Sequence, residues 1–351
     1  MTKSQSATPT IRDIAKLAKV HYSTVSLALN NNPRIPLATR NHIQEIAASL
    51  GYSKNSALSA LSNCRHETES QQAPQLLVVS NRETYHEFKR LKHNQLILSG
   101  ISHQAKLLGY DSDLVIVGNQ ADSIDTLKAK AFSKEVSGII LASLHPPFPS
   151  LFSGHSNIRL VKIDSAFIKG PGMQISCDNQ QGVRLALRRL AKIGYSKIGL
   201  ATGRYDDLST YGHHYGGYKI GMSENGLPEY PIHMMEESDT DEVATDKLER
   251  WIREHKFDAV ISNWNSIPVY LHKSGFAQEH EFAFCSLSLR SKEIPYAGIV
   301  QNHHRLGEQA VNVIAGSMIT EQSQESMFIE GFWKDGDLYP HLGDIDWHNF
   351  E

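Results

Sequence analysis

The chain has 351 residues, a length that is enough for two or three domains. Its composition, 40% hydrophobic and 21% charged, argues against a disordered or fibrous protein. Residues 1–66 carry eight Lys and Arg against two Asp and Glu, whereas the remainder carries 27 Lys and Arg against 36 Asp and Glu. The small basic segment is therefore predicted to bind a polyanion. Three widely spaced cysteines argue against a disulfide framework or a cysteine zinc site, and the N-terminus has no apolar signal segment, so we expect a cytoplasmic protein outside the membrane.

Three short helices are predicted in the first fifty residues. Thr10 is placed to cap a helix with an apolar stripe over residues 11–18. A second helix follows over residues 22–30. A third apolar periodicity, over residues 38–50, ends at Gly51. This spacing predicts a minimal three-helix bundle.

The second helix has two different faces. The face predicted to be buried is aliphatic: Val25, Ala28 and Leu29. The opposite face combines hydroxyl, aromatic and aliphatic groups: Tyr22, Ser23, Ser26 and Leu27. A helix-turn-helix buries one face of its second helix and lays the other in the major groove of DNA. Periodicity and charge favour that interpretation over a three-helix protein-interaction module whose hydroxyl groups are merely solvated.

Beyond the bundle, weak helical character around Leu58 and Leu61 passes into a polar stretch over residues 62–74, a predicted linker. Short apolar runs then alternate with amphipathic segments. The predicted strands cover residues 75–80, 113–118, 137–143, 158–164, 197–203, 257–263 and 281–287. The predicted helices cover residues 93–108, 122–132, 180–193, 240–255 and 305–319. This alternation predicts parallel α/β units, which bind ligands at the carboxyl ends of their strands.

Residues 10–61 closely resemble the DNA-binding head of the LacI/GalR family of bacterial transcription regulators. The matching residues are Thr10, Ile14, Ala15, Ala18, Val20, Thr24, Val25, Ser26, Asn30, Thr39, Arg40, Leu50, Gly51, Tyr52 and Asn55. The resemblance implies that Tyr22 and Ser23 contact bases. It implies that Thr24, Ser26, Asn30 and Arg40 hold the phosphate backbone. The full set of expected DNA contacts is Thr10, His21, Tyr22, Ser23, Thr24, Ser26, Leu27, Asn30, Arg40, Tyr52, Asn55 and Leu61.

The head departs from the family pattern at three positions. Lys19 replaces the usual turn glycine, and His21 replaces the usual serine. Leu27 stands where an arginine often contacts guanine, so the operator sequence of known members does not transfer. The family pattern also places a hinge helix after the bundle, with Leu61 wedged into the minor groove; the alternative is that Leu58 and Leu61 pack on the body.

The remainder resembles the periplasmic-binding-protein-like core of the same family, in which two lobes clamp a small ligand between strand ends. The expected effector contacts are Asn81, Ser143, Arg204, Asn263, Trp264, Cys285 and Gln301. Cys285 takes the place of the aspartate that binds sugars in the family, and the arginine expected near Tyr211 is missing. The resemblance therefore names no effector, although a sugar remains a candidate.

Two histidine pairs, His213–His214 and His303–His304, invite a metal interpretation. Adjacent histidines on a helix point about 100° apart, and we expect these pairs to lack acidic or cysteine partners nearby, so we expect no metal. Motifs for phosphate binding, nucleophilic serine hydrolysis, zinc proteolysis and dinucleotide binding are missing from the sequence. We expect no cofactor and no enzymatic activity.

The predicted fold class is therefore α/β: an N-terminal all-α helix-turn-helix head and a two-lobed periplasmic-binding-protein-like core of parallel α/β subdomains. The predicted segments are a DNA-binding domain (1–53), a hinge helix and linker (54–74), an effector-binding and dimerisation core (75–340) and a tail (341–351). The predicted function is a homodimeric, effector-controlled DNA-binding regulator, most simply a repressor. The alternatives are a sugar-modifying enzyme fused to a DNA-binding head and a solute-binding protein.

Overall fold

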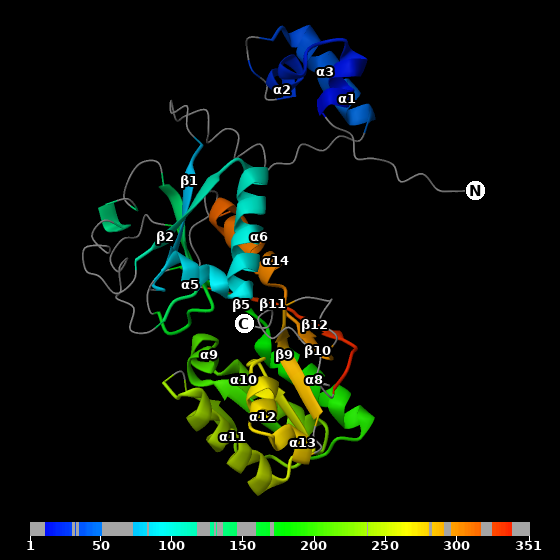
Figure 1. The fold of residues 1–351 in the computed structure, drawn as a ribbon. Helices are drawn as coiled ribbons and strands as arrows, with labels where there is room; N and C mark the ends of the chain where they lie inside the picture. The colour runs from blue at the N-terminus through cyan, green and yellow to red at the C-terminus, as the bar shows by residue number, and fades with distance from the viewer. Residues whose placement is uncertain are drawn as a thin grey trace. The chain divides into compact units, whose positions relative to one another are not determined.

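The computed structural model divides the chain into two compact units, Met1–Glu69 and Ser70–Glu351 (Figure 1). The structure describes residues 11–29, 32, 35–50, 73–82, 84–117, 127–129, 131, 136–145, 159–168, 172–236, 238–280, 283–290, 296–316 and 325–338.

The first unit is a three-helix bundle of α1 (Ile11–Ala18), α2 (Tyr22–Leu29) and α3 (Leu37–Ser49). Its core is formed by one apolar stripe from each helix: Ile14, Ala15, Val25, Ala28, Ile43 and Ala47. The predicted burial of Val25 and Ala28 is confirmed, since both are fully buried, and Leu29 packs partly buried beside them. Gln44 on α3 donates from its amide to the Ala28 carbonyl at 3.3 Å, which ties the end of α2 to α3.

The second unit contains two parallel sheets, each forming one lobe. The sheet of lobe 1 has the order β2-β1-β3-β4-β5-β11, with every neighbouring pair parallel. Its strands are β1 (Gln75–Ser80), β2 (Asp111–Ile116), β3 (Val136–Leu141), β4 (Leu160–Ile163), β5 (Met173–Cys177) and β11 (Ser326–Ile329). The helices described in this lobe are α5 (Tyr85–Arg90), α6 (Lys92–Leu108) and α14 (His303–Gly316).

The sheet of lobe 2 has the order β7-β6-β8-β9-β10-β12, in which only the β10–β12 pair is antiparallel. Its strands are β6 (Ile198–Gly203), β7 (His233–Met235), β8 (Ala259–Ser262), β9 (Ala283–Leu289), β10 (Gly298–Val300) and β12 (Phe332–Lys334). Its helices are α8 (Asn179–Ile193), α9 (Arg204–Ser209), α10 (His213–Glu224), α11 (Asp241–His255), α12 (Ile267–Lys273) and α13 (Phe276–Glu279).

Two apolar clusters cover opposite faces of the lobe 2 sheet. One joins α8 and α10 to the sheet through residues such as Leu187 and Tyr218, and the other joins α11 and α12 through Leu248 and Leu271. The predicted α/β architecture with helices on both faces is therefore confirmed in this lobe. Among the described residues, no helix is both long and apolar enough to cross a membrane.

The chain passes between the lobes after β5, after β10 and after β11. In the second of these passages, α14 returns to lobe 1 and packs along α6, where the two helices run side by side (Figure 1). The carboxyl ends of β5 and β10 therefore lie at the junction of the lobes.

Candidate functional site: a helical DNA-binding surface and a cavity between two lobes

The outward face of α2 carries exposed apolar and aromatic groups. Tyr22 is 55% exposed and Leu27 is 36% exposed, as predicted for this face. The ring of His21 lies 4.2 Å from the ring of Tyr22, so the two form one aromatic patch at the start of α2. The side chains of Ser23 and Ser26 lie outside the described residues, as do the other predicted contacts Thr10, Asn30, Tyr52, Asn55 and Leu61.

Two further predicted DNA contacts are held partly inside the bundle. Thr24 is half-buried. Arg40 is also half-buried, and its guanidinium donates to the Ile35 carbonyl at 3.4 Å. This bond orients Arg40 from the start of α3 toward the loop that joins α2 and α3.

The turn between α1 and α2 adopts a left-handed conformation at Lys19, with φ of 53°. The amides of Lys19 and Val20 donate back to the carbonyls of Lys16 and Ala15 at 3.4 and 3.1 Å. A side chain makes this conformation costly, which explains why glycine suits the position.

A cavity of about 640 Å³ lies at the carboxyl ends of the strands of both sheets, the place predicted for a ligand. Its size is in the range of small-molecule sites. Residues that follow strands line it from each lobe: Arg82, Ser143 and Asp164 from lobe 1, and Tyr205, Asp206, Asn263, Trp264 and Arg290 from lobe 2.

Asp206 organises the lobe 2 side of the cavity. Its Oδ2 accepts hydrogen bonds from the Asn263 amide at 2.6 Å and from the Trp264 indole at 2.8 Å. The Thr202 hydroxyl donates to the side-chain oxygen of Asn263 at 2.9 Å, and this bond fixes the orientation of the Asn263 amide. A Cβ on Gly203 would come within 2.3 Å of Asp206 Oδ2 and 2.7 Å of the indole nitrogen, so glycine is required for this arrangement.

Positive charge gathers at the other side of the cavity, around His93 and His303. Burial lowers the pKa of His93, and the charges of His303, Arg290 and Arg82 lower it further. Burial also lowers the pKa of His303 to about 4, with a contribution from Arg290. Both imidazoles are therefore neutral at pH 7. His303 Nδ1 is shielded from solvent and has no hydrogen-bond partner among the described residues.

Asp164, directly after β4, is the most perturbed carboxyl group of the cavity. Burial raises its pKa to about 7, and the charge of Asp206 raises it too, whereas a hydrogen bond from Ser176 lowers it. Its Oδ1 is shielded from solvent and lacks a partner among the described residues. Near neutral pH this carboxyl group changes between hydrogen-bond donor and acceptor.

Four of the seven predicted effector contacts line the cavity: Ser143, Asn263, Trp264 and Gln301. Gln301 is held within lobe 2, since its amide donates to Asn179 at 2.7 Å and its oxygen accepts from Ser288 at 3.2 Å. Ser143 accepts hydrogen bonds from the Arg82 Nε at 3.1 Å and from the Asn94 amide at 3.0 Å.

The other three predicted contacts are outside the cavity lining. Cys285 is fully buried in the apolar core of lobe 2, where burial raises the pKa of its thiol to about 12. Asn81 is used by the protein itself, because its side chain exchanges two hydrogen bonds with the backbone of His145 at 2.7 and 2.8 Å. Arg204 points to the exposed surface and pairs with Glu236 at 2.7 Å.

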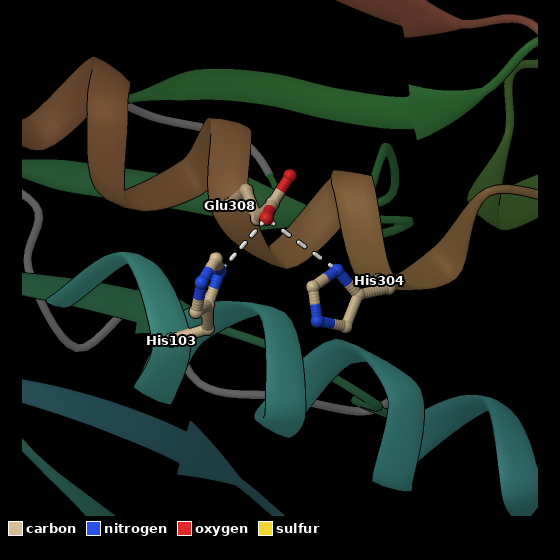
Figure 2. A group of neighbouring side chains, drawn as sticks. All are labelled: His103, His304 and Glu308. Atoms are coloured by element: carbon tan, nitrogen blue, oxygen red, sulfur yellow. Dashed lines mark hydrogen bonds and ion pairs between the residues drawn. The ribbon is translucent and has the colours of Figure 1, made fainter. Parts of the chain in front are cut away.

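The expectation that the histidine pairs lack acidic partners is wrong. His214 Nδ1 lies 3.8 Å from the Asp207 carboxylate, and Asp207 accepts from the backbone amides of His214 and Tyr215. His304 lies 3.5 Å from Glu308, one helical turn further along α14. His103 on α6 completes a group with His304 and Glu308 (Figure 2).

Sequence reasoning missed several polar residues of the cavity. They are Arg82, His93, Asp164, Asp206, Arg290 and His303. Arg82, Asp164, Asp206 and Arg290 each come within three residues of a strand end, so strand-end position was the available signal. His93 and His303 begin helices instead, and only the packing of α14 beside α6 brings them together.

Two family profiles match most of the chain. Residues 10–55 match "Bacterial regulatory proteins, lacI family", and residues 76–274 match "Periplasmic binding proteins and sugar binding domain of LacI family". Catabolite control protein A of Priestia megaterium is 22% identical over 249 residues, covering 70% of each chain. The transcriptional repressor PurR of Actinobacillus pleuropneumoniae is 21% identical over 333 residues, covering 90% of this chain and 93% of that protein. The fold is similar to that of the lac repressor dimer bound to operator, with a TM-score of 0.58, 17% identity and coverage of 95% of this chain and 99% of that one.

Proposed function

The chain belongs to the LacI family of bacterial regulatory proteins and is a DNA-binding transcription regulator, and we propose that its operator affinity is controlled by a small anionic, hydroxyl-bearing molecule in the cavity between the lobes. The observation that carries this proposal is that Arg82 from lobe 1 and Arg290 from lobe 2 line the same cavity, together with the buried histidines His93 and His303.

Three of the acidic groups that line the cavity have partners within lobe 2. Asp206 accepts from Asn263 and Trp264, Glu236 pairs with Arg204, and Asp239 pairs with Lys247 at 2.8 Å. A guanidinium group donates bidentately to a carboxylate or a phosphate, and such charge-assisted bonds are stronger than neutral ones. The Arg82 and Arg290 side of the cavity therefore suits an anionic group.

The lobe 2 side suits the hydroxyl-bearing part of the same molecule. The indole N–H of Trp264 donates to Asp206, and the side chain lines the cavity, where its ring can stack on a sugar ring or another flat ligand. Ser209, Thr210 and Asn265 add hydroxyl and amide groups to the lining. A sugar acid and a sugar phosphate both combine an anion with hydroxyl groups.

We assign DNA binding to residues 1–53, through the exposed face of α2 with Tyr22 and Leu27. Residues 54–74 are proposed as hinge and linker, 75–340 as the effector-binding and dimerisation core, and 341–351 as a tail. Two heads on one homodimer require two half-sites about one helical turn, roughly 10 base pairs, apart. Since the target is chromosomal DNA, we place the protein in the cytoplasm and propose a regulatory role without catalysis.

The DNA part is tested by footprinting the full chain on DNA upstream of its own coding sequence. The expected result is protection of one pseudo-palindromic site, with Tyr22→Ala and Leu27→Ala weakening specific binding more than binding to unrelated DNA. Uniform, sequence-independent retention would contradict the assignment.

The effector part is tested by titrating neutral sugars, sugar acids and sugar phosphates while recording tryptophan fluorescence and operator affinity. Acidic ligands are expected to bind at least tenfold more tightly than their neutral counterparts. Arg82→Gln and Arg290→Gln should remove that preference, and Arg188→Gln, at an exposed position on α8, is the matched control. Equal affinity for neutral and acidic ligands would contradict an anion site.

A further inference from the structure

Three side chains of the types that ligate metals converge at the contact between α6 and α14, outside the lining of the ligand cavity. His103 comes from α6, and His304 and Glu308 come from α14 (Figure 2). Glu308 Oε1 lies 3.0 Å from Nδ1 of His103 and 3.5 Å from Nδ1 of His304. One ligand atom of each residue lies within 4.8 Å of the other two.

The two helices are locked together beside this group by glycines. A Cβ on Gly100 would lie 1.9 Å from the carbonyl oxygen of His304, and a Cβ on Gly307 would lie 2.2 Å from that of Ile97. The backbones therefore touch within one helical turn of all three side chains. One turn further along, Gln104 donates to Asn312 at 2.6 Å across the same contact.

Two of the three spacings in this group are compatible with a tetrahedral metal centre. Zn–N and Zn–O bonds of about 2.0–2.2 Å place neighbouring tetrahedral ligands about 3.3–3.5 Å apart. The two observed nitrogen–oxygen distances, 3.0 and 3.5 Å, bracket this value. Two imidazoles and one carboxylate suit zinc and its neighbours in the first transition series, whereas magnesium and calcium prefer oxygen ligands.

We propose that His103, His304 and Glu308 bind one divalent transition-metal ion of the zinc class per chain, with water as the fourth ligand. Solvent reaches the site, since the side chains of His103 and His304 are 55% and 43% exposed, while Glu308 is 22% exposed. The ion replaces the two contacts of Glu308 with the imidazoles by direct coordination, and it links α6 to α14. This proposal is independent of the effector and of DNA binding.

The link is placed next to the ligand cavity. His93 and Asn94 on α6 and His303 on α14 line the cavity, and His304 is the next residue on α14. The bound ion therefore holds together the two helices whose first turns line the cavity. Metal binding is expected to raise the unfolding temperature of the full chain.

The experiment uses tag-free, full-length protein that has been stripped of metal with a chelator. Zn²⁺ is titrated in competition with a chromogenic chelator, and Co²⁺ is added separately to record the visible absorption of a tetrahedral centre. The wild-type chain is expected to bind one ion. His103→Ala and Glu308→Gln should each weaken binding at least tenfold and remove the cobalt bands, whereas His86→Ala, an exposed histidine on α5, should leave both unchanged.

Glu308→Gln preserves the size of the side chain, and circular dichroism checks that each variant is folded. Zinc bound with equal affinity by the wild type, His103→Ala and Glu308→Gln would overturn the proposal, because the ion would then be held elsewhere. Failure of the wild-type chain to compete with the chelator at micromolar zinc would overturn it as well.

Discussion

Replacing Asp164 by Asn should make the stability of the protein less dependent on pH. The ordinary pKa of this carboxyl group is 3.8, and burial raises the pKa to about 7 in the folded chain. Between these values the folded state binds more protons than the unfolded state, so the group reduces stability progressively as pH rises from 4 to 7. Above pH 7 the full cost is present, and below pH 4 it vanishes.

The magnitude follows from the same two values. A pKa that rises from 3.8 to about 7 corresponds to about 4 kcal/mol at 1.36 kcal/mol per pH unit. Water in the adjacent cavity screens part of this cost, so Asp164→Asn should stabilise the protein by about 2–4 kcal/mol at pH 8 and by close to zero at pH 4. Asn tolerates the positive φ of 45° at this position, so the backbone is preserved.

The measurement is urea unfolding of the full chain, followed by circular dichroism at 222 nm at pH 4, 6 and 8. The difference between Asp164→Asn and wild type isolates this carboxyl group from the buried histidines, which titrate in both proteins. Asp111→Asn, at an exposed carboxyl group on β2 of the same lobe, is the matched control. A stability difference that stays constant from pH 4 to 8 would refute the reasoning.

Three further predictions concern the backbone and the hinge. Lys19→Gly should stabilise the head by about 1 kcal/mol in thermal unfolding, because it relieves the left-handed turn. Gly216→Ala should stabilise the protein by about 0.5–1 kcal/mol, because a Cβ at this position of α10 meets open space. Gly100→Ala should destabilise the protein by several kcal/mol, because a Cβ there meets the backbone of α14. Equal melting temperatures of the two variants would contradict both expectations. If Leu61 is a minor-groove wedge, Leu61→Ala should weaken operator binding in a filter assay and leave the melting temperature unchanged. If Leu61 packs on the body instead, the substitution should lower the melting temperature as the loss of a buried core leucine does.

The helices of the head could be predicted almost residue by residue, because each buries a single apolar stripe. Longer helices of the core, such as α8 and α11, were also located to within one residue. Short strands were missed. β7 and β10 have three residues each, too few for a pattern. β5 contains Gln174 and Ser176, whose buried side chains hydrogen-bond to each other at 2.9 Å, and this polar pair interrupts the apolar run.

The cavity could be placed from the sequence, but its chemistry could not. Parallel strands fix where loops meet, so Trp264 was placed from the end of its predicted strand, whereas Gln301 was placed from the family resemblance because β10 was missed. Cys285 was misplaced because it lies inside β9, five residues before Arg290. The proximity of His103 and Glu308 could not be predicted from the sequence, since 205 positions separate the two residues and only the packing of α6 on α14 brings them together.

The charge distribution suggests how a ligand is linked to DNA binding. Arg82 follows β1 in lobe 1 and Arg290 follows β9 in lobe 2, and the charges of both act on His93. Two cations facing one cavity from separate lobes repel each other, and an anion placed between them removes that repulsion. The proposed anionic effector would therefore favour approach of the lobes, in addition to the contacts that it makes itself. Whatever change in operator affinity this approach causes, operator DNA must change effector affinity by the same factor.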